Sequence, residues 1–378
     1  MALLTARQLN RATLHRQHLL ARARVPAVEA VRRVVAIQAQ EPASPFVALW
    51  NRVAAFDADD LHRAFAAGEI VKATLLRITL HAVTLHDHGP FRAAMESNLR
   101  AARLNDDRFK ATGLTPADAD RLIPDLVAFA RSPRTKEEIE AHLTEAVGST
   151  PPPGLWWALR TVAPLVHAPT GGPWSFGLRP SFLAAPAPVA DLDPEASLRR
   201  LAWRYLEAFG PATAADFAQF AMQKRTVARA TFEALAERLH RHDGPEGLAV
   251  FDLPEGAVPD GDTPAPPRLL PMWDSTLLAY DDRRRLIPED LRSLVIRRNG
   301  DVLPTLLIDG FVAGVWRPVE DGIEVAPLRP LDDDTWHDVT TEARALLEFL
   351  RSRDPTIYRR YAGWWSKLPV PHPRVLVR

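Results

Sequence analysis

Residues 197–256 place helical segments and a strand-like run in an order that few folds accommodate. SLRRLAWRYLEAFG (197–210) has the spacing of an amphipathic helix that ends at Gly210, and PATAADFAQFA (211–221) predicts a short helix with Thr213 as its N-cap. TVARATFEALAERL (226–239) predicts a longer helix, and GLAVFDLPEG (247–256) predicts a strand and a turn. A β-wing that follows helices joined by a tight turn is the winged variant of the helix-turn-helix.

Residues 115–185 follow the same plan and indicate an internal repeat. Thr115 precedes a first-turn proline, Thr135 and Glu138 form a capping-box pattern, and a tryptophan-rich helix is expected over 154–169. The Gly-Gly pair in PTGGPWSFGLRPSF (169–182) then predicts a hairpin.

The N-terminal third is the candidate for a divergent third copy of this unit. Helices are expected over 5–20 and 26–38, and again after Asp57 with Gly68 near the end. VKATLLRITLHAVTLHD (71–87) predicts two short strands, or one strand that leads into a helix, with a break at HDHGP (86–90).

The pattern changes beyond residue 268 to strand-like runs, with a hairpin signal at Asp309-Gly310, and then to a helix. The expected fold is mainly α with small β elements. We expect winged-helix (helix-turn-helix) units in tandem at residues 1–112, 113–190 and 191–260, and a hairpin-rich C-terminal α+β element at residues 268–378.

The chain has 378 residues with 47 basic and 47 acidic side chains, so its formal net charge is zero. A DNA-binding protein needs local positive potential, which clusters such as Arg283–Arg285 supply; a solvated face is the alternative interpretation of any one cluster. The absence of cysteine excludes disulfides and thiolate metal sites and agrees with a reducing cytoplasm. Early charges argue against a signal peptide, and no apolar run reaches membrane-spanning length. We expect a soluble, cytoplasmic protein.

The sequence has no G-x-S-x-G, P-loop or dinucleotide-binding pattern. His81, His86, His88 and Asp87 lie close together in the sequence, but no further matched pair follows at a ligand spacing. Capping or surface roles are therefore favoured over a metal site, and neither a metal nor a cofactor is expected. The wing pattern alone leaves DNA binding and protein binding both open, and it does not distinguish a regulator from an enzyme.

Four segments together resemble the bacterial winged-helix DNA glycosylases of the AlkZ and YcaQ type. In VVAIQAQEP (34–42), Gln38 and Gln40 form the Gln-x-Gln of the AlkZ branch, and LLRITLHAV (75–83) is similar to the family's Arg-x-Thr-x-His segment. LLPMWDSTLLAYDDR (269–283) and LPTLLIDGFVAGVWR (303–317) resemble its two C-terminal signatures. The segments fall in the expected order across most of the chain, although Ile78 and Ala279 stand where the family has glycine.

The resemblance implies tandem winged helices around a concave DNA-binding surface, and an enzyme that hydrolyses the bond between deoxyribose and an alkylated base. N7-alkylated purines, bulky or crosslinked ones included, are the expected substrates. The expected partner is double-stranded DNA that carries them, bound by a monomer associated with the nucleoid. Gln38 and Gln40 are the implied catalytic residues, which would position water and stabilise positive charge on the sugar. The structural alternative is that they cap a helix that ends near Ile37.

Arg77, Thr79 and His81 alternate along the predicted strand and would share one face of it. That face is a candidate DNA contact, and an ordinary polar sheet face is the alternative.

The basic run Arg283, Arg284 and Arg285 is a candidate phosphate clamp. For Arg283, an ion pair with Asp282 or Asp274 is the favoured alternative. Trp273 and Tyr280 are expected in the core. A non-catalytic winged-helix regulator is the second candidate function, and an interaction module that ignores nucleic acid is the third.

Overall fold

The structure is a computed structural model that describes residues 3–148, 153–177, 179–186, 192–320, 322–354, 356–368 and 374–377. The N-terminal unit contains α1 (Ala6–Arg16), α2 (Ala27–Val34), β1 (Ile37–Gln38), α3 (Ser44–Arg52), α4 (Ala58–Ala66), β2 (Ile70–Thr74), β3 (Leu80–Thr84) and α5 (Leu85–Leu104). Helix α6 (Asp107–Lys110) ends the predicted first unit. The predicted second unit contains α7 (Pro116–Phe129), β4 (Arg134–Thr135), α8 (Lys136–Val147), α9 (Gly154–Val162), β5 (Leu165–Ala168) and β6 (Ser181–Ala184).

The third unit contains α10 (Pro194–Phe209), α11 (Ala214–Ala221), α12 (Arg225–Glu233) and the wing strands β7 (His240–Asp243) and β8 (Ala249–Asp252). The C-terminal element contains β9 (Arg268–Leu270), α13 (Arg292–Val295), β10 (Thr305–Ile308), β11 (Phe311–Val319), β12 (Gly322–Pro327), α14 (Asp333–Arg351), α15 (Ala362–Trp365) and β13 (Arg374–Val377). Its β10–β11 turn is Asp309-Gly310, which confirms the predicted hairpin.

Side-chain caps set the starts of several helices, as the sequence predicts. The Thr hydroxyl at each N-cap accepts from the backbone amide three residues on, and that residue's carboxylate accepts from the cap's own amide. This capping box opens α7, α8 and α11, at Thr115, Thr135 and Thr213 respectively. Asp57 likewise caps α4.

Several predicted boundaries are wrong. The helix expected over 5–20 ends at Arg16, and the helix expected over 226–239 ends at Glu233. The helix expected over 26–38 ends at Val34, because Val35 has a φ of 72°, outside the helical region. The break expected at 86–90 lies inside α5, since the Thr84 hydroxyl accepts from the amide of Asp87 and starts the helix there. The helix expected over 154–169 ends at Val162, and strand β5 follows.

A six-stranded sheet in the order β1-β3-β2-β5-β6-β4 runs through both the N-terminal and the second unit. Strand β1 pairs antiparallel with β3, with Ile37 opposite Ala82 and Gln38 opposite His81. Strand β2 meets β5 at the pair Lys72 and His167. Because this sheet includes strands from two of the predicted units, it marks no boundary between them, and the unit boundaries stay predictions.

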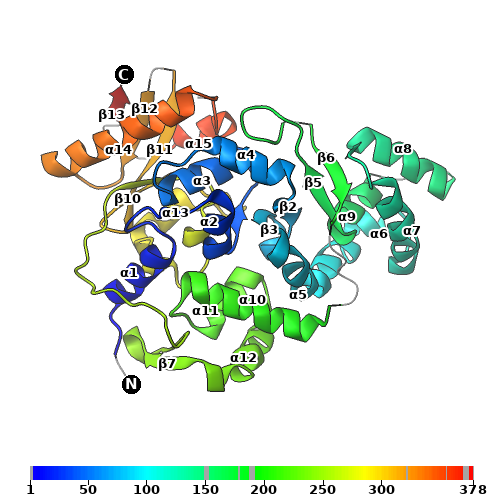
Figure 1. The fold of residues 1–378 in the computed structure, drawn as a ribbon, viewed down its shortest axis with the longest axis horizontal. Coiled ribbons are helices and arrows are strands. Elements are labelled where there is room, and N and C mark those ends of the chain that lie inside the picture. Colours follow the sequence, from blue (N-terminus) through cyan, green and yellow to red (C-terminus); the bar gives the residue numbers. More distant parts are fainter. Residues whose placement is uncertain are drawn as a thin grey trace.

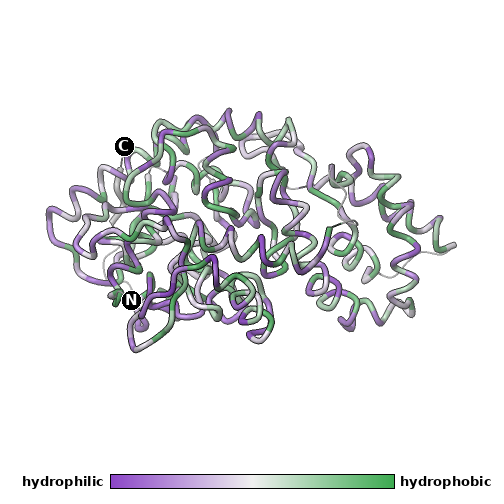
Figure 2. Tube along the Cα trace, turned by 60° about the horizontal axis from the view of Figure 1, so that its bottom comes forward, coloured by the Kyte–Doolittle hydropathy of each residue, from purple (hydrophilic) through white to green (hydrophobic). Residues whose placement is uncertain are grey.

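The units are arranged along an elongated molecule, with α7 and α8 at one end and the C-terminal sheet with α14 at the other (Figure 1). Helix α10 of the third unit packs along α5. Hydrophilic and hydrophobic residues alternate along many of the helical coils, as expected of helices with one buried face (Figure 2). None of the described helices combines the length and the apolar character that a membrane span requires.

The C-terminal element is joined to the N-terminal unit by a buried ion pair. Arg52 of α3 donates two hydrogen bonds to Asp274, at 2.9 and 2.8 Å, and the two side chains are 2% and 1% exposed. Trp273 and Tyr280, from the same C-terminal segment, are buried as predicted. Asp274 therefore stabilises the contact between the two parts of the chain.

Candidate active site

Gln38 lies at the end of β1, where the register of the sheet places it opposite His81. Its side chain is 4% exposed, and its Oε1 accepts a hydrogen bond from Nη2 of Arg77 at 2.9 Å. The same Nη2 lies 3.3 Å from Nε2 of His81. The sheet thus brings together Gln38, Arg77 and His81, which we call the Gln38 cluster.

Arg77 lies in a tight turn between β2 and β3, so the prediction that Arg77, Thr79 and His81 alternate along one strand is wrong. The turn η1 (Leu76–Ile78) has positive φ at two consecutive residues, 51° at Arg77 and 58° at Ile78. Glycine tolerates this region far better than a β-branched residue does, so Ile78 stands in a strained position where the resemblance predicts glycine. The turn folds the Arg77 side chain back toward β1 rather than along β3.

His81 is held in its neutral form. Its Nδ1 donates to the Thr79 carbonyl at 3.0 Å, so Nε2 carries the lone pair that accepts from Arg77. Burial and the nearby charge of Arg77 lower the pKa of His81 to about 3. At neutral pH the imidazole is therefore a fixed hydrogen-bond acceptor that orients Arg77.

Arg77 carries a positive charge that no ion pair neutralises within the described part of the chain. Its Nη1 donates to the Phe220 carbonyl of α11 at 3.4 Å, and its guanidinium lies 5.7 Å from the centroid of the Phe220 ring. Burial, together with the charge of Arg283, lowers the pKa of Arg77 to about 9. The proximity of Arg283 adds positive potential beside the Gln38 cluster.

Gln40 is solvent-exposed, two residues along from the buried Gln38. Its Oε1 accepts from the backbone amide of Leu80 at 3.0 Å, so both glutamines are anchored to the β2–β3 hairpin. The alternative that they cap a helix is wrong, because α2 ends at Val34 and neither amide bonds to it. Each carbonyl oxygen keeps a second lone pair, but only Gln40 is solvent-exposed, whereas Gln38 is buried with its oxygen against Arg77.

Thr79 closes the turn from within, since its hydroxyl donates to the Leu76 carbonyl at 3.1 Å and its own carbonyl binds His81. It therefore supports the position of the imidazole. Whether Thr79 contacts DNA stays a prediction.

The three arginines of the basic run have different surroundings. Arg283 donates to the Leu277 carbonyl at 2.9 Å, so the predicted pairing with Asp282 or Asp274 is wrong. Arg284 is exposed and pairs with Asp282, and Asp274 pairs with Arg52. Arg285 donates to the Pro211 carbonyl and lies over the Tyr280 ring. Only Arg284 presents an exposed guanidinium, and a phosphate would have to compete with Asp282 for it.

The histidines near the start of α5 do not assemble a metal site. His86 lies against Arg200, Asp87 pairs with Arg200 and Arg204, and His88 is buried. No group of three or more potential ligands comes together anywhere in the described ranges.

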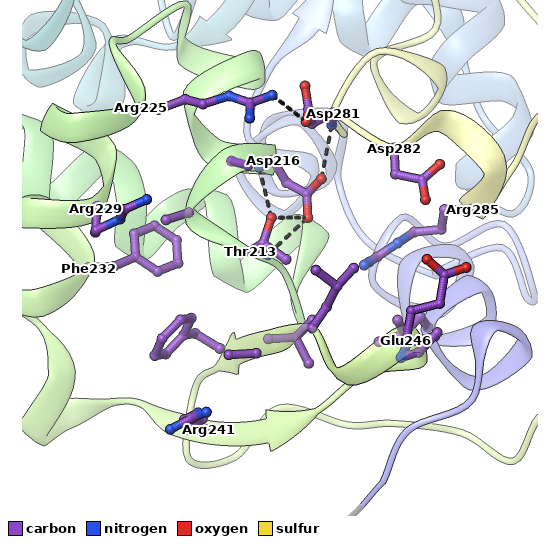
Figure 3. A pocket seen from close by; sticks show the side chains of 18 of the residues that line it. Thr213, Asp216, Arg225, Arg229, Phe232, Arg241, Glu246, Asp281, Asp282 and Arg285 are labelled. Atoms are coloured by element: carbon purple, nitrogen blue, oxygen red, sulfur yellow. Dashed lines mark hydrogen bonds and ion pairs between the residues drawn. The ribbon is translucent and has the colours of Figure 1, made fainter.

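A cavity of about 830 Å³ lies between α11, α12 and the β7–β8 wing (Figure 3). Some of its charged groups pair with each other, as in the 2.8 Å contact of Arg225 with Asp281. Neither Gln38 nor Gln40 lines it.

The sequence did not predict one residue that contacts the site. Phe220, whose carbonyl binds Arg77, belongs to α11 of the third unit, and nothing in its local sequence marks this contact. The signal lies only in the tertiary packing of α11 against η1.

The fold defines the class: a mainly helical protein built from winged-helix-like units, the arrangement by which many proteins bind double-stranded DNA. The model of the family described as DNA glycosylase AlkZ-like matches residues 31–349, and the chain belongs to this family. It is therefore a DNA N-glycosylase, a hydrolase of the bond between base and sugar, rather than a non-catalytic regulator.

A curated relative agrees with the assignment, and a solved structure agrees with the fold. The interstrand DNA cross-link repair glycosylase of Streptomyces sahachiroi is 28% identical over 337 residues, which cover 83% of this chain and 88% of the relative. The solved structure of the DNA glycosylase AlkZ from Streptomyces sahachiroi has a TM-score of 0.78 at 24% identity, over 92% of this chain and 96% of that one. This likeness confirms the predicted fold class.

Proposed function

We propose that this glycosylase excises N7-alkylated purines from double-stranded DNA, including bulky adducts and bases joined in interstrand crosslinks. Alkylation at N7 gives the base a positive charge and makes it a good leaving group, so the enzyme needs little general-acid help. The bond to the sugar then breaks through a state with positive charge on the deoxyribose. The crosslink repair named for the Streptomyces relative motivates the inclusion of crosslinked bases.

Gln38 and Gln40 would act by position and dipole rather than as bases. An amide does not take up a proton at neutral pH, but its carbonyl oxygen accepts a hydrogen bond from water and carries partial negative charge toward the sugar. Arg77 fixes the orientation of the Gln38 amide, and the Leu80 amide fixes that of Gln40. The anchoring of both amides to one hairpin is the observation on which the proposal rests.

Glu41 would add negative charge next to the two amides. Burial lowers the pKa of Lys72 to about 8, and the charge of Glu41 opposes this effect, which places its carboxylate within electrostatic reach of β2. An electrostatic role without proton transfer is the functional interpretation of Glu41, and a solvated carboxylate is the favoured alternative.

The test is release of free base from duplexes that carry N7-methylguanine, a bulky N7 adduct or an N7–N7 crosslink, in a buffer with EDTA. Gln40→Ala should lower the single-turnover rate by about 10- to 100-fold, with little change in affinity for the duplex. Gln8→Ala is the matched control, since the Gln8 side chain also accepts from a backbone amide, that of Thr5, but lies in the capping box of α1. Absence of base release from every duplex by the unmodified enzyme would refute the proposal, and an unchanged rate in Gln40→Ala would refute the role of Gln40.

A further inference from the structure

Met222 presents a large apolar side chain to solvent at the turn between α11 and α12. It is 52% exposed, although the two residues before it, Phe220 and Ala221, are fully buried. Exposed methionine is common on surfaces that bind, because its flexible thioether adapts to an apolar partner.

The backbone holds Met222 in a strained and fixed conformation. Its φ of 52° and ψ of 42° lie in the left-handed region, where glycine or asparagine is favoured at the end of a helix. Nδ2 of Asn98 donates to its carbonyl at 2.8 Å, and the amide of Gln223 donates to the Ala218 carbonyl at 2.9 Å. A strained position that keeps a large exposed side chain, where glycine would fit, points to a use for that side chain.

Met222 adjoins the Gln38 cluster. The Phe220 carbonyl, two residues before it, accepts from Arg77, and Arg77 binds Gln38. Asn98, which fixes the Met222 carbonyl, comes from α5, and both α5 and α11 lie against η1. Met222 therefore lies two residues along the chain from Phe220, which contacts the Gln38 cluster through Arg77. Leu248, which is 47% exposed, lies instead on the wing beside the 830 Å³ cavity.

We propose that Met222 enters the base stack of the duplex next to the damaged base and so exposes the glycosidic bond to Gln38 and Gln40. Apolar side chains that insert between base steps unstack them and bend the helix, and methionine is among the residues that do so. The separation of stacked bases costs a few kcal/mol, which a rigidly presented side chain offsets by filling the gap. The inference rests on the proposed function, since it needs a duplex bound across the Gln38 cluster.

The test measures unstacking and chemistry separately. The first duplex carries 2-aminopurine, whose fluorescence rises when it leaves the stack, next to a 2′-fluoro N7-methylguanosine that resists hydrolysis. The second duplex carries ordinary N7-methylguanine for single-turnover base release. Met222→Gly is the main variant because glycine relaxes the positive φ, so the variant keeps its thermal unfolding temperature while losing the side chain.

The enzyme should brighten the 2-aminopurine on binding. Met222→Gly and Met222→Ala should lose most of this signal and release base at least about tenfold more slowly, whereas Met222→Leu should retain both properties. Leu248→Ala, the matched exposed apolar control, should behave as the unmodified enzyme. Brightening and base release in Met222→Gly equal to those of the unmodified enzyme would overturn the inference and leave the proposed function intact. Conversely, brightening that depends on Met222 without base release from any alkylated duplex would support the inference and refute the proposed function.

Discussion

Replacement of Arg77 by methionine should separate the activity of this enzyme from its stability. Arg77 is the hub of the Gln38 cluster, with contacts of 2.9 Å to Gln38, 3.3 Å to His81 and 3.4 Å to the Phe220 carbonyl. Methionine has a similar length and an apolar end. Arg77→Met therefore removes the charge and the hydrogen bonds while leaving little empty space.

The expected magnitude follows from these contacts. A hydrogen bond to a charged group contributes about 1.5–3 kcal/mol, and about 1.4 kcal/mol corresponds to a tenfold change in rate. Because the hydrogen bond from Arg77 orients the Gln38 amide, its loss should slow base release by roughly 10- to 100-fold. Stability should fall by only about 1–2 kcal/mol, because the removal of a buried charge that lacks a carboxylate partner among the described residues offsets part of the cost of the three acceptors left unpaired.

The assay combines single-turnover base release with urea unfolding, and Arg329→Met serves as the control. Arg329 is half-exposed and pairs with Asp290 at 2.8 Å, away from the glutamines. The pKa of His81 should also rise in Arg77→Met, because the Arg77 charge contributes to its depression, and NMR titration of the ring proton would detect this. An unchanged rate, or a loss of several kcal/mol of stability, would refute the reasoning, since Arg77 would then be dispensable or purely structural.

Two further predictions concern stability. Asp274→Asn should lower the free energy of unfolding by about 3–5 kcal/mol, because it leaves the buried Arg52 charge uncompensated; a urea-unfolding loss below about 1 kcal/mol would contradict this. Mainly through burial, the pKa of His81 is lowered to about 3 and that of His88 to about 4. Both side chains are therefore neutral in the folded chain at neutral pH. The unfolded chain takes up protons below about pH 6.5, so this stabilisation is complete above that pH and is lost as the pH falls toward 4. Each histidine should make the unfolding free energy roughly 1 kcal/mol larger at pH 7.5 than at pH 5.5. Equal stability at the two pH values would contradict this prediction.

The starts of the helices were predictable because capping chemistry is local. Thr115, Thr135 and Thr213 each bond to a residue only three positions away, so the sequence contains the whole signal. The ends were harder to predict. Helix α2 ends because Val35 adopts a positive φ, and a valine in the sequence does not predict that conformation.

The candidate site was predicted in its residues and not in its geometry. The motif identified Gln38, Arg77 and His81, and the structure brings these three together. The alternation of polar residues suggested one continuous strand, but Arg77 and Ile78 form a turn with positive φ, which sequence reasoning assigns to glycine. The contact with Phe220 depends on a helix far along the chain, so only the tertiary fold reveals it.

The junction between β2 and β5 has a consequence for how this protein can be divided. Strands β2 and β5 lie side by side in the sheet and pair at Lys72 and His167, so each covers an edge of the other. Cutting the chain between the N-terminal and second units would leave two unpaired edges, which promote association between copies. Recombinant pieces that separate these units should aggregate, and exchange of parts between relatives should keep both halves of the sheet from one parent.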